Sequence, residues 1–399
     1  MTPKSFMLIA GEASGDLLAT ELVSALHAQS SILDPPSSPV FYGAGGSRMA
    51  AAEVELALDL TQHSVIGISD VLKNYFKFRR LFHQLLKLAI KRQPDAIIGV
   101  DYGGFNLRFG HAIKQYVRKN QSASTPWNPK IIQFVSPQVW ASRPGRANLL
   151  AADYDLLLSI FPFEKVWYAK RVPKLRVEFV GHPMVERFIS EGRVPRAPDT
   201  DILGARGTRP SEILLLPGSR ADELRRHLPV MLGALKLIRE KLLSAKAKMV
   251  LPDEALKQLA DRLTALPSDM EIQIGNLPQA LAQADVAIAS TGTVTMECAF
   301  FGVPTVTLYK TSWSTYQIGK RIVKVKWLTM PNILADEEIY PEFVQGAATP
   351  GPIAGAALEL LQNEPRRIQI KKRLAEVVSS LGGPGATTRA ATAILSLFA

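Results

Sequence analysis

Residues 213–228 combine an apolar run, a tight turn and the start of a helical pattern. The run that begins at Ile213 ends in Pro217-Gly-Ser-Arg220, and the helical pattern follows directly. This order predicts a buried strand and a helix N-terminus. Such a turn presents unpaired backbone N–H groups, and the helix dipole there favours an anion. The stretch fits either a diphosphate seat or an ordinary strand–helix turn capped by Ser219, and it contains neither a Walker A nor a GxGxxG motif.

The same order of strand, turn and helix recurs along the chain, and it decides the fold class. Apolar runs that fit buried strands occupy 6–10, 41–46, 96–100, 131–135 and 156–160, then 213–216, 248–252, 271–274, 286–289 and 304–308. Strands that alternate with helices predict parallel sheets covered by helices on both faces. We therefore expect an α/β chain with two Rossmann-like, doubly wound domains that face each other across a cleft.

A proline- and arginine-rich stretch at about 181–212 separates the two sets of strands. It predicts an N-terminal domain over 1–182 and a C-terminal domain over 183–363. The last residues, 364–399, form a basic helical pattern that we expect to pack back on the first domain. Ligands of such sheets bind at the C-terminal ends of the strands, so we expect the site there.

Composition excludes several classes of protein. No apolar run in the 399 residues approaches the ~20 that a membrane-spanning helix needs. The single cysteine, Cys298, excludes an intrachain disulfide and a cysteine-rich metal site. The first residues read as a strand and not as a signal peptide, which indicates the cytoplasm. The net charge of +11 indicates an anionic partner such as nucleic acid, anionic lipid or a phosphorylated substrate.

Asp101 is the first candidate for a catalytic residue. It follows the apolar run Ala96–Val100, and Gly103 and Gly104 come after it. A carboxylate at the end of a buried strand stands at the expected cleft, and the glycines leave room for a substrate. The position therefore predicts a general base, or alternatively the N-cap of the next helix.

A second candidate site follows the apolar run 286–289. The hydroxyls and backbone N–H groups of Ser290-Thr-Gly292-Thr293 fit a phosphate. Glu297, about one turn into the next helix, fits the two hydroxyls of a ribose. The same residues also fit a capped helix with an acid in its first turn.

Residues 71–92 combine aromatic, aliphatic and basic side chains. Such a helix fits either an anionic bilayer surface or a core helix with a solvated basic face. Phe78 beside Arg79 breaks a clean two-face pattern, which favours the membrane interpretation. A second basic and aromatic stretch contains Lys320, Arg321, Lys324, Lys326 and Trp327.

No metal site is predicted. The triplet Asp153-Tyr-Asp155 precedes a strand, which is the wrong end for the cleft, and Asp199-Thr-Asp201 lies in the proline-rich stretch. The six histidines are scattered, and no nucleophile-elbow motif occurs.

Taken together, these residues resemble the lipid-A-disaccharide synthases, bacterial glycosyltransferases of the GT-B fold. The motifs occur in the family's order: Gly11-Glu-Ala-Ser-Gly-Asp16, Ser64-Val-Ile-Gly-Ile68, Ser136-Pro-Gln-Val-Trp-Ala141, Phe161-Pro-Phe-Glu164, Gly181-His-Pro183, Leu216-Pro-Gly-Ser-Arg220, Thr291-Gly-Thr293 with Glu297, and Lys320-Arg321 through Pro331-Asn332. Their order and spacing over nearly the whole chain are specific.

The resemblance implies an inverting transfer of 2,3-diacylglucosamine from UDP to the 6-hydroxyl of 2,3-diacylglucosamine-1-phosphate (lipid X). A β-1,6 disaccharide forms and UDP leaves, with no metal or other cofactor. The acceptor and the membrane would meet domain 1–182, and the UDP-sugar would bind domain 183–363. The enzyme would be cytoplasmic, peripherally bound to the anionic inner membrane, and without a nucleic-acid partner. The family also implies a possible homodimer that exchanges its C-terminal segments.

The resemblance also assigns site residues. Asp101 matches the base. The donor positions are Ser14, Ser219, Arg220, Gly292, Thr293, Glu297 and Asn332. Contact with the membrane or acyl chains falls to Phe76, Phe78, Arg79, Arg80 and Phe82.

Four positions depart from the family pattern. Gly103-Gly104 replaces Pro-Asp after the base, Ser142 replaces a second Trp, and Lys310 replaces Arg. Two alternatives remain. One is another GT-B enzyme that uses a UDP-sugar, such as the peptidoglycan N-acetylglucosaminyl transferase or a UDP-sugar 2-epimerase. The other is a non-catalytic nucleic-acid- or membrane-binding protein, which leaves Asp101 and the glycine turns unexplained.

Overall fold

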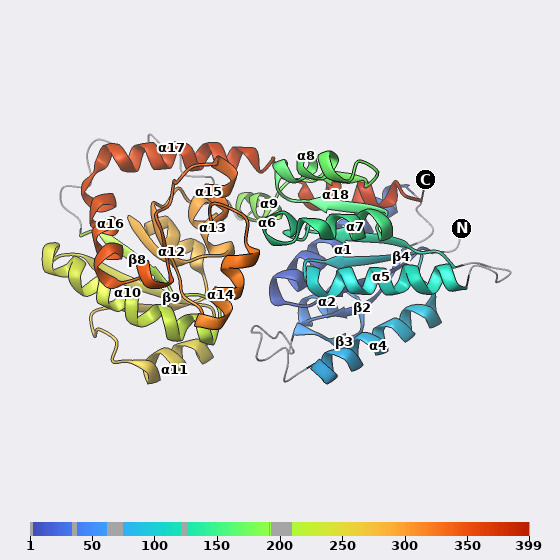
Figure 1. Cartoon of the computed structure of the whole chain (residues 1–399), viewed down its shortest axis with the longest axis horizontal. Helices are drawn as coiled ribbons and strands as arrows, with labels where there is room; N and C mark the ends of the chain where they lie inside the picture. Colours follow the sequence, from blue (N-terminus) through green and yellow to red (C-terminus); the bar gives the residue numbers. More distant parts are fainter. Residues whose placement is uncertain are drawn as a thin grey trace. The chain divides into compact units, whose positions relative to one another are not determined.

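The computed structural model describes residues 3–33, 38–61, 75–120, 127–190, 192 and 210–398. These residues form two compact units (Figure 1). The first contains residues 1–187 and 381–399, and the second contains residues 188–380. The predicted motif Ser64–Ile68, the start of the aromatic stretch at 71–74 and the Asp199–Asp201 triplet lie outside the described residues.

The first unit is built on a seven-stranded sheet in which every neighbouring pair is parallel. The strand order is β3-β2-β1-β4-β5-β6-β7. The strands are β1 (Ser5–Ala10), β2 (Val40–Gly45), β3 (Glu55–Asp59), β4 (Ala96–Val100), β5 (Lys130–Phe134), β6 (Leu156–Ser159) and β7 (Val177–Phe179). This order, which reverses direction between β1 and β4, is that of a doubly wound fold.

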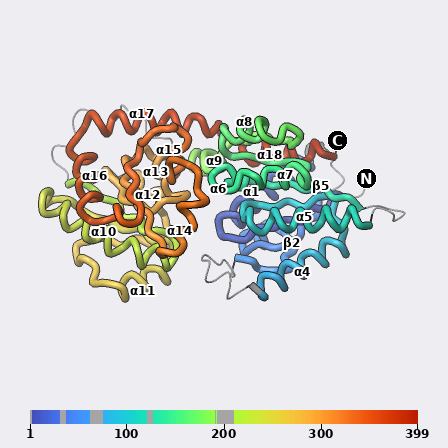
Figure 2. The backbone as a smooth tube through the Cα atoms, viewed as in Figure 1, coloured from blue at the N-terminus to red at the C-terminus, as the bar shows by residue number. Residues whose placement is uncertain are grey.

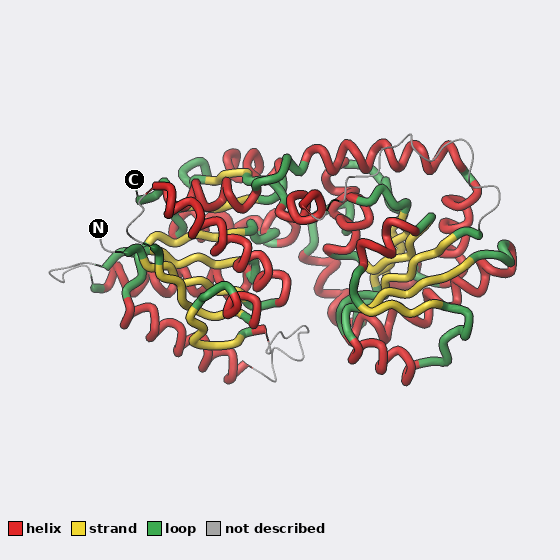
Figure 3. Tube along the Cα trace, turned by 180° about the vertical axis from the view of Figure 1, so that it is seen from behind, coloured by secondary structure: helices red, strands yellow, loops and turns green. Residues whose placement is uncertain are grey.

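Helices cover both faces of this sheet (Figure 3). They are α1 (Ala13–Leu33), α2 (Ser47–Ala51), α4 (Tyr75–Arg92), α5 (Gly103–Lys119), α6 (Val139–Ser142), α7 (Ala147–Asp153), α8 (Pro162–Arg171) and α18 (Ala386–Leu395), while α9 (Pro183–Ser190) contains the boundary between the units. Alternate residues of a strand point to opposite faces. Met7 and Ile9 of β1 lie in one core cluster with Leu85 and Phe109, while Phe6 stacks on Phe41. Both sides of β1 are therefore buried, which explains its continuous apolar run.

The second unit repeats the architecture with six parallel strands in the order β10-β9-β8-β11-β12-β13. The strands are β8 (Glu212–Leu216), β9 (Lys246–Leu251), β10 (Glu271–Ile274), β11 (Val286–Ser290), β12 (Thr305–Tyr309) and β13 (Glu342–Val344). The helices are α10 (Ala221–Lys241), α11 (Glu254–Leu263), α12 (Leu277–Gln283), α13 (Thr293–Phe300), α14 (Trp313–Ile322), α15 (Met330–Ala335), α16 (Pro350–Gln362) and α17 (Glu364–Ser380). The predicted fold class, two doubly wound α/β sheets, is confirmed.

The C-terminal segment 364–399, predicted as one piece, is divided between the units. α17 packs against α13, α15 and α16 of the second unit, where it buries Leu374 and Val377. α18 packs along α1 of the first unit (Figure 2). The unit boundaries at 187/188 and 380/381 therefore differ from the expected ones at 182/183 and 363/364. The second boundary separates α17 from α18, because each of these helices packs on a different unit, whereas the first boundary falls within α9. Exchange of this segment in a dimer stays a prediction.

One face of α4 belongs to the core of the first unit. The Phe82 ring packs edge-on against Phe105 and Phe109, with ring centroids 5.4 and 5.6 Å apart. Leu85, three residues later, is fully buried. Phe82 is only partly buried, and its ring packs on the core side of α4, because residues three and four apart share one side of a helix and this side faces the sheet. The predicted contact of Phe82 with the membrane or acyl chains stays a prediction.

The opposite face of α4 is exposed. Phe76 is 79% exposed, and Arg79 and Arg80 are also exposed, while Phe78 is partly buried. The exposed part of the predicted contact surface is thus Phe76 and the two arginines, with Phe78 at its border. Among the described helices, none is both long and apolar enough to cross a bilayer.

Phe82→Ala and Phe76→Ala should separate the two faces of α4. Removing a partly buried ring leaves a cavity, so Phe82→Ala should lower the free energy of unfolding by about 2–3 kcal/mol. Phe76→Ala should change it by no more than about 0.5 kcal/mol. Urea unfolding of the pair measures both values. Equal destabilisation would contradict the packing described here.

His182, in the predicted motif Gly181–Pro183, holds the start of α9. Its Nδ1 accepts a hydrogen bond from the Met184 N–H at 3.2 Å, one of the groups that a helix start leaves unpaired. The backbone N–H of His182 donates to the Leu381 carbonyl at 2.9 Å. Burial, assisted by the positive charge of Arg187, lowers the pKa of His182 to about 4. The neutral ring is therefore the form that the fold requires.

Because of this lowered pKa, the free energy of unfolding decreases as the pH falls. The unfolded chain has a His pKa near 6.5, so the contribution of His182 is complete above that pH. It falls by about 3 kcal/mol as the pH drops from 6.5 to 4. His182→Asn keeps a helix-capping oxygen without a titrating ring, so its stability should fall less over the same interval. Urea midpoints between pH 7 and 4 measure the difference, and identical slopes would contradict the assignment.

Candidate active site

Asp101 lies at the carboxyl end of β4, in a strained turn. Asp101 and Tyr102 have φ angles of 49° and 45°, a region that residues other than glycine rarely adopt. The Asp101 carbonyl accepts hydrogen bonds from Asn106 Nδ2 at 2.9 Å and Gln133 Nε2 at 2.8 Å. Both amides are buried, and Gly99 is small enough to leave them space. The turn is therefore fixed from below by two side chains.

The environment of the Asp101 carboxyl favours a base of raised pKa. Burial raises its pKa most, and the Glu12 carboxylate raises it further. Hydrogen bonds from the Tyr102 backbone N–H and the Ser14 side chain oppose this shift. Ser14 was predicted with the donor residues, but in the structure it belongs to the first unit and contacts Asp101. A carboxylate with raised pKa is a stronger proton acceptor at neutral pH.

The three glycines near Asp101 differ in what a side chain at each position would meet. A Cβ on Gly11 would lie 2.3 Å from the Tyr102 ring, so Gly11 permits this ring to pack on the first loop. A Cβ on Gly103 would lie 2.7 Å from the Pro137 side chain. A Cβ on Gly104 would meet no described atom within 4 Å. Position 104, where the family pattern has an acid, therefore stands beside open space.

Glu164, the last residue of the predicted motif Phe161–Glu164, joins two loop motifs of the first unit, a role that the sequence did not assign to it. Its Oε1 accepts from Trp140 Nε1 at 2.9 Å, and its Oε2 lies 2.6 Å from Ser159 Oγ. Ser159 Oγ also lies 2.7 Å from the Phe161 carbonyl. One hydroxyl proton cannot serve both oxygens, so a protonated Glu164 satisfies every acceptor. Burial raises the pKa of Glu164 to about 7. Hydrogen bonds act in the opposite direction, and the one with Ser159 lowers the pKa most.

Asp16, the last residue of the motif that begins at Gly11, is structural. Its buried carboxylate accepts from the backbone N–H groups of Gly46, Arg48 and Met49 at 2.7, 3.1 and 3.2 Å. These groups start α2, so Asp16 fixes the second strand–helix turn to the first. The motif thus combines a structural acid with Ser14 at the candidate base.

The second unit contains a cavity of about 400 Å³ at the carboxyl ends of β8, β9 and β11. It is lined by five of the predicted donor residues: Ser219, Arg220, Gly292, Thr293 and Glu297. Asn276 and Glu223 also line it, although the sequence did not predict them. The two predicted turns, each after a buried strand, therefore meet in one pocket within the unit.

An internal carboxylate lies over the Pro217–Arg220 turn. Glu223 accepts a hydrogen bond from the Ser219 backbone N–H at 3.1 Å and pairs with Arg220 at 3.4 Å. Gly218 has a φ of 118°, and a Cβ there would lie 2.4 Å from the Glu223 carboxylate. The N-terminus of α10 therefore already holds one anionic group, as its geometry favours.

His227 supports this turn from inside the unit. Its Nδ1 donates to the Pro217 carbonyl at 2.8 Å, and its Nε2 accepts from the Lys310 backbone N–H at 3.0 Å. This pairing requires the neutral ring with its proton on Nδ1. Burial lowers the pKa of His227, which favours that form. His227 therefore connects the end of β12 to the turn after β8.

Asn332 is not brought to the pocket, and its assignment as a donor ligand is corrected. It is fully buried. Its Oδ1 accepts from the N–H groups of Ile339 and Tyr340, both at 2.9 Å, and its Nδ2 donates to the Tyr340 carbonyl and to Glu342. All its hydrogen-bonding positions are used inside the unit. The motif around it positions the segment before β13.

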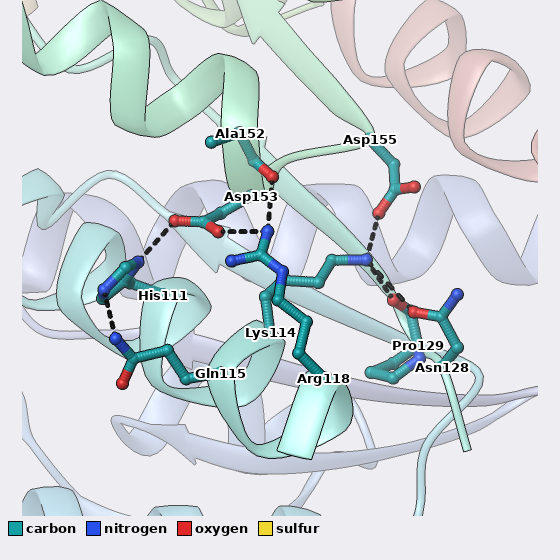
Figure 4. Close-up of polar contacts among 9 residues, drawn as sticks. All are labelled: His111, Lys114, Gln115, Arg118, Asn128, Pro129, Ala152, Asp153 and Asp155. Carbon is teal, nitrogen blue, oxygen red and sulfur yellow. Dashed lines mark hydrogen bonds and ion pairs between the residues drawn. The ribbon is translucent and has the colours of Figure 1, made fainter. Parts of the chain in front are cut away.

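The acidic triplet before β6 forms ion pairs (Figure 4). Asp153 accepts from Arg118 at 3.1 Å and lies 2.7 Å from His111 Nδ1. Asp155 pairs with Lys114 at 3.1 Å. These contacts hold α5 against the segment between α7 and β6, at the amino-terminal edge of the sheet. Within the described ranges, no group of three or more His, Cys, Asp or Glu side chains could hold a metal.

Comparison with known sequences identifies a family. The family model described as lipid-A-disaccharide synthetase matches residues 6–396. The lipid-A-disaccharide synthase of Trichlorobacter lovleyi is 35% identical over 399 residues, covering 99% of this chain and 98% of that protein. That of Syntrophus aciditrophicus is 34% identical over 403 residues, covering 100% and 98%.

Solved structures share the fold. A UDP-GlcNAc 2-epimerase from Neisseria meningitidis, bound to UDP-GlcNAc, matches with a TM-score of 0.58 at 10% identity, over 99% of this chain and 100% of that one. S. aureus MnaA, solved with UDP, gives 0.62 at 12% identity, over 99% and 97%. The glycosyltransferase of kitacinnamycin gives 0.57 at 16% identity, over 99% of both chains.

Proposed function

Because the chain belongs to the lipid-A-disaccharide synthase family, we propose that it transfers 2,3-diacylglucosamine from UDP to the 6-hydroxyl of lipid X. The products are the β-1,6 disaccharide 1-phosphate and UDP. The observation that carries this proposal is what lies at the carboxyl edge of each sheet. In the first unit, a carboxylate of raised pKa stands in a strained turn, and in the second unit five predicted donor residues line one cavity.

In the proposed reaction, Asp101 accepts the proton of the acceptor's 6-hydroxyl as that oxygen attacks C1 of the donor. The bond from C1 to the UDP oxygen breaks on the opposite side, so the configuration inverts. The fixed backbone of Asp101 supports this role, because a general base must be held within hydrogen-bond reach of its proton. Ser14 orients the carboxylate through its hydrogen bond.

The leaving UDP is stabilised by the second unit. The N-terminus of α10 and the Arg220 guanidinium supply positive charge where negative charge develops on the diphosphate. Glu297 would bind the ribose hydroxyls, and Glu223 would yield its place over the turn to the diphosphate. We propose that these groups act without a metal cofactor; product formation in the presence of a chelator tests this.

We further propose that the protein is cytoplasmic and binds the inner membrane surface, where both acylated substrates lie. Phe76 with Arg79 and Arg80 on α4 supports this placement, because an exposed aromatic ring among cations suits an anionic bilayer surface.

Asp101→Asn should lower the rate of transfer by about a hundredfold or more, because the amide cannot accept the hydroxyl proton. The backbone hydrogen bonds of residue 101 remain available, and the donor pocket lies in the other unit, so UDP affinity should stay unchanged. Asp95→Asn, at the opposite end of β4, is the matched control and should retain transfer. The assay uses both substrates in detergent micelles, with UDP binding by calorimetry. Normal turnover by Asp101→Asn would refute the base.

Arg220→Ala should weaken UDP binding by about 10- to 100-fold, the typical effect of losing a charged hydrogen bond. Arg225→Ala is the control on the same helix, because Arg225 is exposed, pairs with Asp222 and does not line the pocket. Calorimetric titration with UDP measures both. Equal affinities for the two variants would place the diphosphate elsewhere.

A further inference from the structure

α14 differs from a helix that packs on its own unit. The structure describes all of its residues, and none of them is buried. Trp313 is 75% exposed and Ile318 is 45% exposed. Val323, directly after the helix, is 39% exposed. Large apolar side chains at three positions along one short segment, each five residues after the last, are therefore exposed.

The same segment is strongly basic. Residues 310–335 contain three more lysines and one arginine after Lys310, and they contain no aspartate or glutamate. Lys320, Arg321, Lys324 and Lys326 are exposed. This part of the chain therefore presents cations and apolar groups together, without a neutralising acid in its own sequence.

The position of α14 relates it to the donor pocket. Three residues separate the end of β12 from the start of α14, which places the start of the helix at the carboxyl edge of the second sheet. β12 pairs with β11, and the end of β11 supplies Ser290 to the pocket. A surface bound by α14 would therefore lie at the sheet edge where the donor's nucleotide binds.

We propose that α14 and the residues up to Trp327, which we call the α14 surface, bind an anionic lipid bilayer. The proposal rests on the proposed function, in which the donor carries acyl chains. Trp313 suits the boundary between headgroups and hydrocarbon, and the four exposed cations suit anionic headgroups. A protein partner fits less well, because the centre of a protein interface is poor in lysine. The second unit would thus meet the membrane that supplies its substrate.

The test uses the full chain and vesicles of phosphatidylcholine with or without phosphatidylglycerol. The variant carries Trp313→Ser and Ile318→Ser, and Leu243→Ser, at a 91% exposed leucine of the same unit, is the control. All are made in a Phe76→Ser background, so that α4 contributes little. We expect the parent and the control to sediment with anionic vesicles, and the double variant to bind about fivefold or more weakly.

Retention of UDP binding by the double variant shows that its second unit is folded. If UDP binding is lost, a second variant that carries Lys320→Gln and Lys324→Gln tests the proposal instead, and it should bind anionic vesicles more weakly. Unchanged vesicle binding by the folded variants, or a change only in oligomeric state, would overturn the proposal. Transfer in detergent micelles is measured separately, so a failure of the proposed reaction is distinguished from a failure of the α14 surface.

Discussion

The turn that positions Asp101 in the first unit depends on one backbone carbonyl. The Asp101 carbonyl accepts two hydrogen bonds from buried side-chain amides, those of Asn106 and Gln133. Residues other than glycine in the left-handed region cost on the order of 1–3 kcal/mol each, and two such residues stand here in sequence. The two hydrogen bonds from the buried amides offset part of that cost, because they hold the carbonyl in the orientation that the turn requires. The carboxylate therefore stands at a fixed point instead of on a mobile loop.

The carboxyl edges of the two sheets present different kinds of chemical groups. In the first unit, the candidate base is a side-chain carboxylate, and Glu164 and Asp16 hold the surrounding loops from inside. In the second unit, the candidate anion site consists of backbone N–H groups and a helix terminus, and His227 supports the turn from inside the unit. The carboxylate of Glu223 at that turn shows that the geometry accepts an anion before any ligand arrives. This division suits the proposed reaction, which needs a base for the acceptor and stabilisation of the leaving group.

Sequence predicted the strands and the turns after them, because burial on both faces leaves a continuous apolar run and a glycine turn leaves a local signal. It therefore located Gly292 and Glu297 in the pocket. It misplaced Asn332, because a motif shows that a residue matters and not whether it faces a ligand or the core. It missed Asn106 and Gln133, because both bind a backbone carbonyl, a group that every residue has and that leaves no signal in the sequence. Such long-range contacts have no local periodicity.

The fold alone does not select the reaction. Proteins with 10–16% identity to this chain, an epimerase and a glycosyltransferase among them, share its architecture. Any apolar residue satisfies a buried strand, so the fold persists while the sequences diverge. The turn at Asp101 and Tyr102 is different, because glycine would adopt its φ angles at lower cost. An acid retained in a strained backbone, beside a second carboxylate that raises its pKa, opposes stability. Its presence is what the proposed proton transfer at this edge of the sheet would require.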